Sequence, residues 1–134
     1  MKQTAGILLV RQRKSGPEIL LVHDRKKWSI PKGGLEGRET PEQGARRELL
    51  EETSLVISGD VIPIGYVDYK KENKRLHGFF AEIEGPVKIT LSGELIQGRF
   101  VPLDEAYKLL DVRQRLLLGW VLAGTRAACK ALTS

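Results

Sequence analysis

A glycine-rich loop that leads directly into a helix start restricts the fold of this chain more than any other segment. Three glycines stand within residues 32–38, and Thr40-Pro41 follows them, with Gln43 three residues after the threonine. Threonine at an N-cap, proline at the first helical position and glutamine at the third form a capping-box start. We therefore predict a loop over residues 32–38 and a helix over residues 40–53.

The other segments predict a sheet flanked by further helices. Apolar runs and turn residues predict strands over residues 5–10, 18–23, 57–69, 74–83 and 98–101, a short extended piece over 28–31, and helices over 104–110 and 112–131. Strands and helices mix without a regular βαβ rhythm, which favours an α+β sandwich with a mixed sheet between helices. The length of 134 residues fits a single domain over residues 1–134.

Two apolar patterns predict which faces pack in the core. Alternating residues of the expected strand 57–69 are apolar, namely Ile62, Ile64 and Tyr66. The last expected helix repeats apolar side chains at helical spacing, namely Leu116, Trp120, Ala123 and Ala127. The helical stripe fits either a groove for a partner or a face packed on the sheet, and we expect the packed face.

Composition and charge limit the classes of function. The chain has 41% hydrophobic and 29% charged residues and a single cysteine, Cys129. It has no apolar run of the roughly 18 residues that a membrane helix needs, so we expect a globular protein of the reducing cytoplasm, with no signal segment and no membrane span. The net charge of +5 fits either a polyanionic ligand or ordinary solubility. Basic residues occur in short clusters, which does not favour stable nucleic-acid binding, and no feature predicts an oligomeric state.

Three glutamates gather on one face of the expected helix 40–53. Glu48, Glu51 and Glu52 stand at i, i+3 and i+4, so their carboxylates point to the same side. A solvated helix face explains this spacing, since Arg47 forms an i, i+4 pair with Glu51. A site for Mg²⁺ explains it equally, because this cation takes carboxylate oxygens together with water and phosphate oxygens. Glycines in the preceding loop would let backbone groups approach a metal or a phosphate.

This part of the sequence resembles a known family motif. The pattern reads Gly33, five residues, Glu39, seven residues, Arg47-Glu48-Leu49, one residue, Glu51-Glu52, one residue, Ser54-Leu55. It is similar to the Nudix box of the MutT-like hydrolases, and the preceding residues 28–34 resemble the usual lead-in. Only Ser54 departs, since the box has glycine there, and we expect it to be tolerated with a modest cost in local stability. The resemblance implies a Nudix-type α/β/α sandwich with a mixed central sheet.

The resemblance also implies an enzyme of the Nudix pyrophosphohydrolase type. Such an enzyme cleaves a phosphoanhydride bond in a nucleoside diphosphate derivative and uses Mg²⁺ or Mn²⁺. The implied metal ligands are Glu48, Glu52, Glu51 and the backbone carbonyl of Lys32. Arg47 and Glu39 are expected to pair and orient the loop at Gly33 against the helix. For Arg47, a plain surface ion pair with Glu51 is the alternative.

A further glutamate from outside the box often takes part in catalysis in this family. Glu94, six residues before Phe100, fits that place, with Glu82 and Glu84 as rivals. The general base is then one of three carboxylates, namely Glu48, Glu52 or Glu94.

Substrate contacts are less constrained by the sequence. Lys32, Arg75 and His77 are candidates for binding phosphates or stacking a base, although His77 also fits an ordinary sheet position. The lead-in with Lys32 resembles bacterial dinucleoside-polyphosphate hydrolases, so we expect a small nucleotide or polyphosphate such as diadenosine polyphosphate. Alternatives are a nucleoside triphosphate, an RNA 5′ end, a diphosphoinositol polyphosphate, or a domain that senses a nucleotide without cleaving it. Sensors usually lose box carboxylates, and this chain keeps them.

Overall fold

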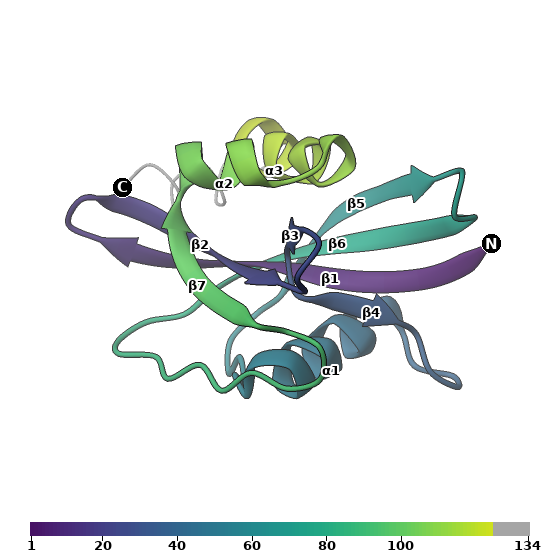
Figure 1. Ribbon diagram of the computed structural model, residues 1–134, viewed down its shortest axis with the longest axis horizontal. Coiled ribbons are helices and arrows are strands. Elements are labelled where there is room, and N and C mark those ends of the chain that lie inside the picture. Colours follow the sequence, from purple (N-terminus) through teal and green to yellow (C-terminus); the bar gives the residue numbers. More distant parts are fainter. Residues whose placement is uncertain (125–134) are drawn as a thin grey trace.

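The central strand of the fold, β1 (Lys2–Arg13), buries side chains on both of its faces. Ile7 and Leu9 belong to one apolar cluster, while Leu8 and Val10 belong to the other. Because successive side chains of a strand point to opposite faces, β1 needs cover on both sides. The computed structural model, which describes residues 1–124, supplies that cover with helices above and below the sheet (Figure 1).

The sheet is mixed, as the sequence predicts. Its strands run in the order β3-β2-β1-β6-β5, while β4 pairs with β1 and β7 pairs with β2. The contact of β1 with β6 is parallel and the other pairings are antiparallel. The remaining strands are β2 (Gly16–His23), β3 (Trp28–Ser29), β4 (Lys32–Gly34), β5 (Ile62–Tyr69), β6 (Lys74–Glu82) and β7 (Gln97–Pro102).

Three helices cover the two faces in the part of the chain that the structure describes. Helix α1 (Pro41–Thr53) packs Ala45 and Leu49 against one face. Helices α2 (Leu103–Leu109) and α3 (Val112–Gly124) cover the other, where Ala106 and Leu117 are buried. Figure 1 shows α1 on the opposite side of the sheet from α2 and α3. The predicted α/β/α sandwich with a mixed central sheet is therefore confirmed. No helix within residues 1–124 is long and apolar enough to cross a membrane.

The segment 57–69 differs from its predicted strand in two ways. Residues 57–61 are irregular, and Ile57 and Val61 pack in the cluster beneath α1, so β5 begins only at Ile62. A register shift between Pro63 and Gly65 inserts an extra residue into β5. The predicted alternation is therefore wrong after Ile64, because Tyr66 is 48% exposed while Val67 is buried.

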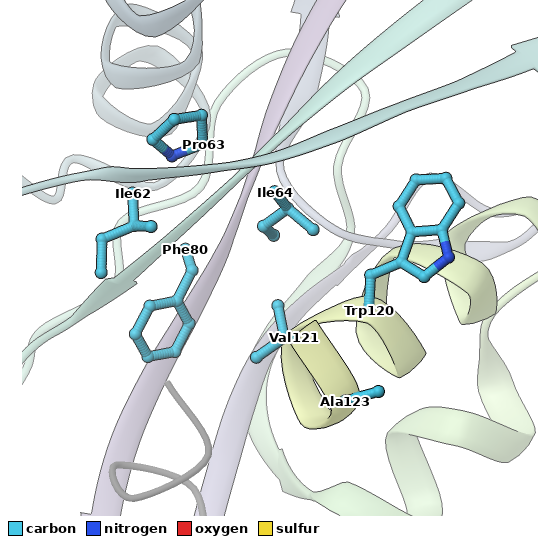
Figure 2. A pocket seen from close by; sticks show the side chains of 7 residues that line it. All are labelled: Ile62, Pro63, Ile64, Phe80, Trp120, Val121 and Ala123. Atoms are coloured by element: carbon cyan, nitrogen blue, oxygen red, sulfur yellow. The ribbon is translucent and has the colours of Figure 1, made fainter. Parts of the chain in front are cut away.

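The predicted core face of the last helix is also wrong. Leu116 and Trp120 are exposed by 43% and 42%, while Leu117, Leu118 and Val121 are buried. Helix α3 is apolar around most of its circumference, so helical spacing alone does not select the face that packs. Trp120 instead borders an apolar cavity of about 350 Å³ between β5 and α3, in which Ile64 and Val121 face one another (Figure 2). Ala127, Cys129 and the predicted continuation of the helix to residue 131 lie outside the described residues.

Candidate active site

Helix α1 carries the three box glutamates and begins where the sequence predicts. The Thr40 hydroxyl accepts a hydrogen bond from the Gln43 backbone N–H at 3.2 Å, and the Gln43 side chain accepts one from the Thr40 N–H at 2.8 Å. This capping box fixes the first turn of the helix. With that start fixed, Glu48, Glu51 and Glu52 fall on the helix face next to β4.

Arg47 ties the glycine-rich loop to the helix. Its guanidinium donates two hydrogen bonds to Glu39, at 2.6 and 3.0 Å, and one to the Gly34 carbonyl at 2.9 Å. Its Nη1 lies 2.9 Å from Glu48 and 3.0 Å from Glu51. These partners raise the pKa of Arg47, and Arg47 lowers the pKa of the Glu39 carboxyl. The predicted pairing of Arg47 with Glu39 is present, and the alternative pairing with Glu51 exists beside it.

Gly33 makes room for Glu48. A Cβ atom at Gly33 would lie within 2.3 Å of the Glu48 carboxyl group, so any side chain there would displace the glutamate. Gly33 belongs to β4, which pairs with β1 inside the segment predicted as a loop. Strand β4 thus places a residue without a side chain, Gly33, directly against the Glu48 carboxylate.

Glu52 is the most perturbed carboxyl group of the site. One of its oxygens accepts a hydrogen bond from the Lys32 backbone N–H at 3.0 Å. Burial raises its pKa to about 7, and the neighbouring charges of Glu48 and Glu51 act in the same direction. Burial also raises the pKa of Glu48. Because the N–H and C=O of one strand residue point to the same side, the Lys32 carbonyl is directed away from β1 as well.

A lysine-lined hollow adjoins Glu52 and continues towards the face of the sheet that carries α3. One cavity of about 50 Å³ is bordered by Glu52, Lys32 and Lys27. A second of about 50 Å³ shares Lys32 and Lys27 and continues to Lys74 and Tyr69. Burial lowers the pKa of Lys32, and the charges of Lys27 and Lys74 lower it further. The hollow therefore gathers three lysines close to Glu52, and two acidic residues, Asp24 and Glu72, also border it.

Arg75 and His77 do not line this hollow. They share one face of β6 with Phe79, which packs in the cluster beneath α1, whereas the lysines lie on the other face. Arg75 donates to Asp68 at 2.8 Å and lies over the Tyr66 ring at 3.8 Å.

The His77 ring already has a hydrogen-bond partner on the same face of the sheet. Its Nε2 lies 2.7 Å from the Gln3 side-chain oxygen. Burial and the charge of Arg75 lower the pKa of His77. A role of Arg75 and His77 in substrate binding stays a prediction.

Glu94 stands in the exposed segment between β6 and β7. Its neighbour Leu95 borders the cavity that contains Glu52 and Lys32, so the backbone at Glu94 is one residue away from that cavity. Its rivals stand elsewhere, since Glu82 ends β6 and Glu84 follows it in an irregular segment, where it is exposed. Its catalytic role remains a prediction.

A buried polar network holds the lead-in to β4, and no motif in the sequence indicates it. The Gln114 side chain, which is 1% exposed, accepts from the Ile30 N–H at 2.9 Å and donates to the Ser29 hydroxyl at 3.2 Å. Asp111 accepts from the Gln114 N–H and from the Tyr69 hydroxyl. The start of α3 thereby anchors the strand segment that precedes Lys32.

The donor set of the site fits a hard divalent cation. Within residues 1–124, no three acidic, histidine or cysteine side chains are gathered closely enough to hold a metal ion as they stand. Glu48 and Glu51 turn towards Arg47 instead, and Glu52 turns towards the Lys32 N–H. All of these donors are carboxylate or carbonyl oxygens, which suit Mg²⁺ and Mn²⁺. Two partly buried carboxylates with raised pKa values would gain from a nearby cation.

The large apolar cavity of Figure 2 is a poor candidate for this chemistry. Its lining residues carry no titratable side chain. Catalysis on an anionic substrate needs charged or polar groups, and these gather at the end of α1.

The sequence matches a known domain family and several known proteins. The model of the NUDIX domain matches residues 1–121 of the chain. An RNA pyrophosphohydrolase of Azorhizobium caulinodans is 41% identical over 64 residues, which are 48% of this chain and 35% of that protein. A putative mutator protein, MutT4, of Mycobacterium tuberculosis is 34% identical over 85 residues, 58% of this chain and 34% of that protein. The chain thus spans about a third of the length of these two relatives.

Solved structures share the fold at low sequence identity. A C. elegans Ap4A hydrolase binary complex superposes with a TM-score of 0.78 at 22% identity, over 92% of this chain and 96% of that one. The NUDIX domain of Shewanella oneidensis NrtR, complexed with ADP ribose, gives a TM-score of 0.72 at 17% identity, over 88% and 83% of the two chains. These likenesses extend the agreement in fold over most of the chain.

Proposed function

Since the chain belongs to the NUDIX family, we propose that it is a divalent-metal-dependent pyrophosphohydrolase that cleaves a phosphoanhydride bond in a nucleoside diphosphate derivative. The proposed substrate class is the dinucleoside polyphosphates, with diadenosine polyphosphate as the example. The observation that carries this choice is the line of lysines that adjoins Glu52.

The carboxylates of α1 are proposed to hold the metal. Glu48 and Glu52 would bind Mg²⁺ or Mn²⁺ directly, with Glu51 and the Lys32 carbonyl as further oxygen ligands. The bound cation would supply neutralisation of phosphate charge. Arg47 would act beside these ligands by fixing the loop, because it already bonds Glu39, Gly34 and Glu48.

The chain's own residues are proposed to position the attacking water and accept its proton. Water attacks phosphorus, the bond from that phosphorus to the bridging oxygen breaks, and the bridging oxygen leaves on the other phosphate. The base is one of Glu48, Glu52 and Glu94. In the protein without metal, burial raises the pKa of Glu52 to about 7, and a bound cation would lower this pKa and keep the carboxylate ionised.

The lysine-lined hollow supports a substrate with more than two phosphates. Lys32 borders the same cavity as Glu52, and Lys74 borders the adjoining cavity, which Lys32 shares. A diphosphate bound at the carboxylates would reach Lys32 and Lys27, while a longer chain would also reach Lys74. Lysine amines act as point charges for phosphate, so each additional phosphate gains a counter-charge along this line.

An RNA 5′ end is the second proposed substrate. Two curated relatives are RNA pyrophosphohydrolases, and the one from Zymomonas mobilis is 61% identical over 28 residues, 21% of this chain and 18% of that protein. The 5′-triphosphate of such an RNA is also a chain of anionic phosphates, which the same lysines could bind. The predicted cytoplasmic location, from the single Cys129, is part of the proposal for either substrate.

A substrate panel tests the proposal. The purified protein is incubated with Mg²⁺ or Mn²⁺ and with diadenosine tetraphosphate, a 5′-triphosphorylated RNA, a nucleoside triphosphate, ADP-ribose and a diphosphoinositol polyphosphate, and products are separated by chromatography. We expect the highest kcat/KM for diadenosine tetraphosphate. A preference for the RNA would select the second substrate, and binding without cleavage across the panel would identify a nucleotide sensor and contradict the enzyme proposal.

A further inference from the structure

The C-terminal end of α1 is closed by a distant segment of the chain. The last carbonyl groups of a helix have no partner inside it. The N–H groups of Thr90 and Ser92 donate to the carbonyls of Thr53 and Glu52, at 3.0 and 3.3 Å. The Ser92 hydroxyl donates to the carbonyl of Glu51. Residues 90–92 therefore act as the cap of the helix turn that carries two of the box glutamates.

Ser54 adds a side-chain bond to this cap. Its backbone is left-handed, with φ of 65°, and its N–H donates to the Leu50 carbonyl at 2.9 Å. Its hydroxyl donates to the Thr90 carbonyl at 3.2 Å. Residues with a Cβ atom are disfavoured in this conformation and glycine is not. The chain thus carries a strained serine where the Nudix box has glycine, and the serine hydroxyl makes a contact that glycine lacks.

The capped segment leads directly to the mouth of the site. Gly93, with φ of 67°, follows Ser92, and Glu94 and Leu95 come next. Leu95 borders the cavity of Glu52 and Lys32. The Ile96 N–H donates to a carbonyl of β2 at 2.9 Å. Residues 93–95 are therefore a short bridge held at both ends, on one side by the helix cap and on the other by the sheet.

We propose that Ser54 and Ser92 are positioning residues that fix this bridge and thereby hold Glu94 and Leu95 beside Glu52. The catalytic part of this inference rests on the proposed function, because it assigns Glu94 a role in turnover. The attachment of the bridge to α1 does not rest on it. The two parts therefore need two readouts.

Limited trypsin digestion tests the attachment. Lys88 is exposed in the segment just before Thr90, and cleavage there is followed by the mass of the fragment 1–88. Losing one hydrogen bond of the cap should speed this cleavage about fivefold in Ser54→Gly and in Ser92→Ala. The matched control is Ser58→Gly, since Ser58 is exposed four residues after Ser54 in an irregular segment. Wild-type cleavage rates at Lys88 in both cap variants would overturn the proposal.

The thermal midpoint of Ser54→Gly separates positioning from general stability. Glycine suits φ of 65°, so the variant should keep or raise the wild-type midpoint while its Lys88 site becomes more accessible. A purely structural role predicts that the midpoint and the resistance to trypsin fall together. That parallel fall would overturn the proposal.

A double-mutant cycle tests the link to Glu94. Ser92→Ala should lower kcat about fivefold to tenfold with little change in KM, and Ser92→Thr, which keeps the hydroxyl, should restore it. In a Glu94→Gln background, Ser92→Ala should cause no further loss, because both changes then act on one group. Independent, multiplying losses would overturn the positioning role. Absence of turnover on every substrate would contradict the proposed function instead, and trypsin would still decide the attachment.

Discussion

Replacing Glu52 by glutamine removes one charge from the site and keeps the size of the side chain. In the absence of metal, the Glu52 carboxyl lies near the charges of Glu48 and Glu51 and accepts from the Lys32 N–H, and burial raises its pKa from 4.5 to about 7. Between these pH values the folded state keeps a proton that the unfolded state has released. The free energy of unfolding therefore falls as the pH rises from 4.5 to 7 and stays level above 7.

The size of this effect follows from the two pKa values. A pKa change from 4.5 to about 7 corresponds to roughly 3 kcal/mol in the free energy of unfolding for a group fully shielded from water. Glu52 is only partly buried, so we expect about 2 kcal/mol after screening by solvent. Without metal, Glu52→Gln should nearly equal the wild type near pH 4, below the unfolded pKa, and exceed its free energy of unfolding by about 2 kcal/mol at pH 8.

Urea denaturation at pH 4 and pH 8, with a chelator and with saturating Mg²⁺, measures this difference. Mg²⁺ should stabilise the wild type at pH 8 through binding to the folded state, and it should leave Glu52→Gln nearly unchanged. Turnover of the variant should fall at least ~100-fold, about 2.7 kcal/mol of barrier. Asp60→Asn, an exposed acid outside the site, is the control. The same stability difference at both pH values would refute the burial of this charge, and wild-type turnover would remove Glu52 from the site.

Three further substitutions test the packing around the carboxylates and the binding of phosphates by the lysines. Gly33→Ala should destabilise the fold by about 2 kcal/mol and lower turnover at least tenfold, because its Cβ would meet the Glu48 carboxyl; urea denaturation and turnover measure both, and a neutral result would contradict the close packing. Arg47→Lys should lower the free energy of unfolding by about 1–2 kcal/mol at pH 7, since lysine cannot make the paired hydrogen bonds to Glu39. That cost should shrink as the pH falls through the lowered pKa of Glu39, and a cost that is the same at pH 3 and pH 7 would argue against the pair. Lys74→Ala should raise KM about tenfold for diadenosine tetraphosphate and leave KM for ADP-ribose unchanged; equal effects on both would contradict an extended phosphate line.

The sequence predicts the parts of the site that depend on neighbours along the chain. The start of α1 follows from Thr40 and Gln43, whose mutual bonds span three residues. The common direction of Glu48, Glu51 and Glu52 follows from helical spacing alone. The contact of Glu39 with Arg47 came from the family resemblance, and it lies between the loop and the helix that follows it directly.

The parts assembled from distant segments were not predictable in this way. Lys27 and Lys74 belong to separate basic clusters, and Lys74 comes near Lys32 because β1 pairs with both β4 and β6. Gln114 anchors Ile30 across 84 residues of sequence. A bulge reverses the faces of β5 after Ile64, and alternating hydrophobicity gives no sign of it.

The dependence of turnover on metal tests the central claim most directly. Hydrolysis of diadenosine tetraphosphate by the wild-type protein is followed in excess chelator and after addition of Mg²⁺ or Mn²⁺. The carboxylates of α1 offer only oxygen donors to a cation, and the lysines alone do not activate water, so we predict no turnover in chelator and full recovery with either metal. Undiminished turnover in chelator would contradict the account.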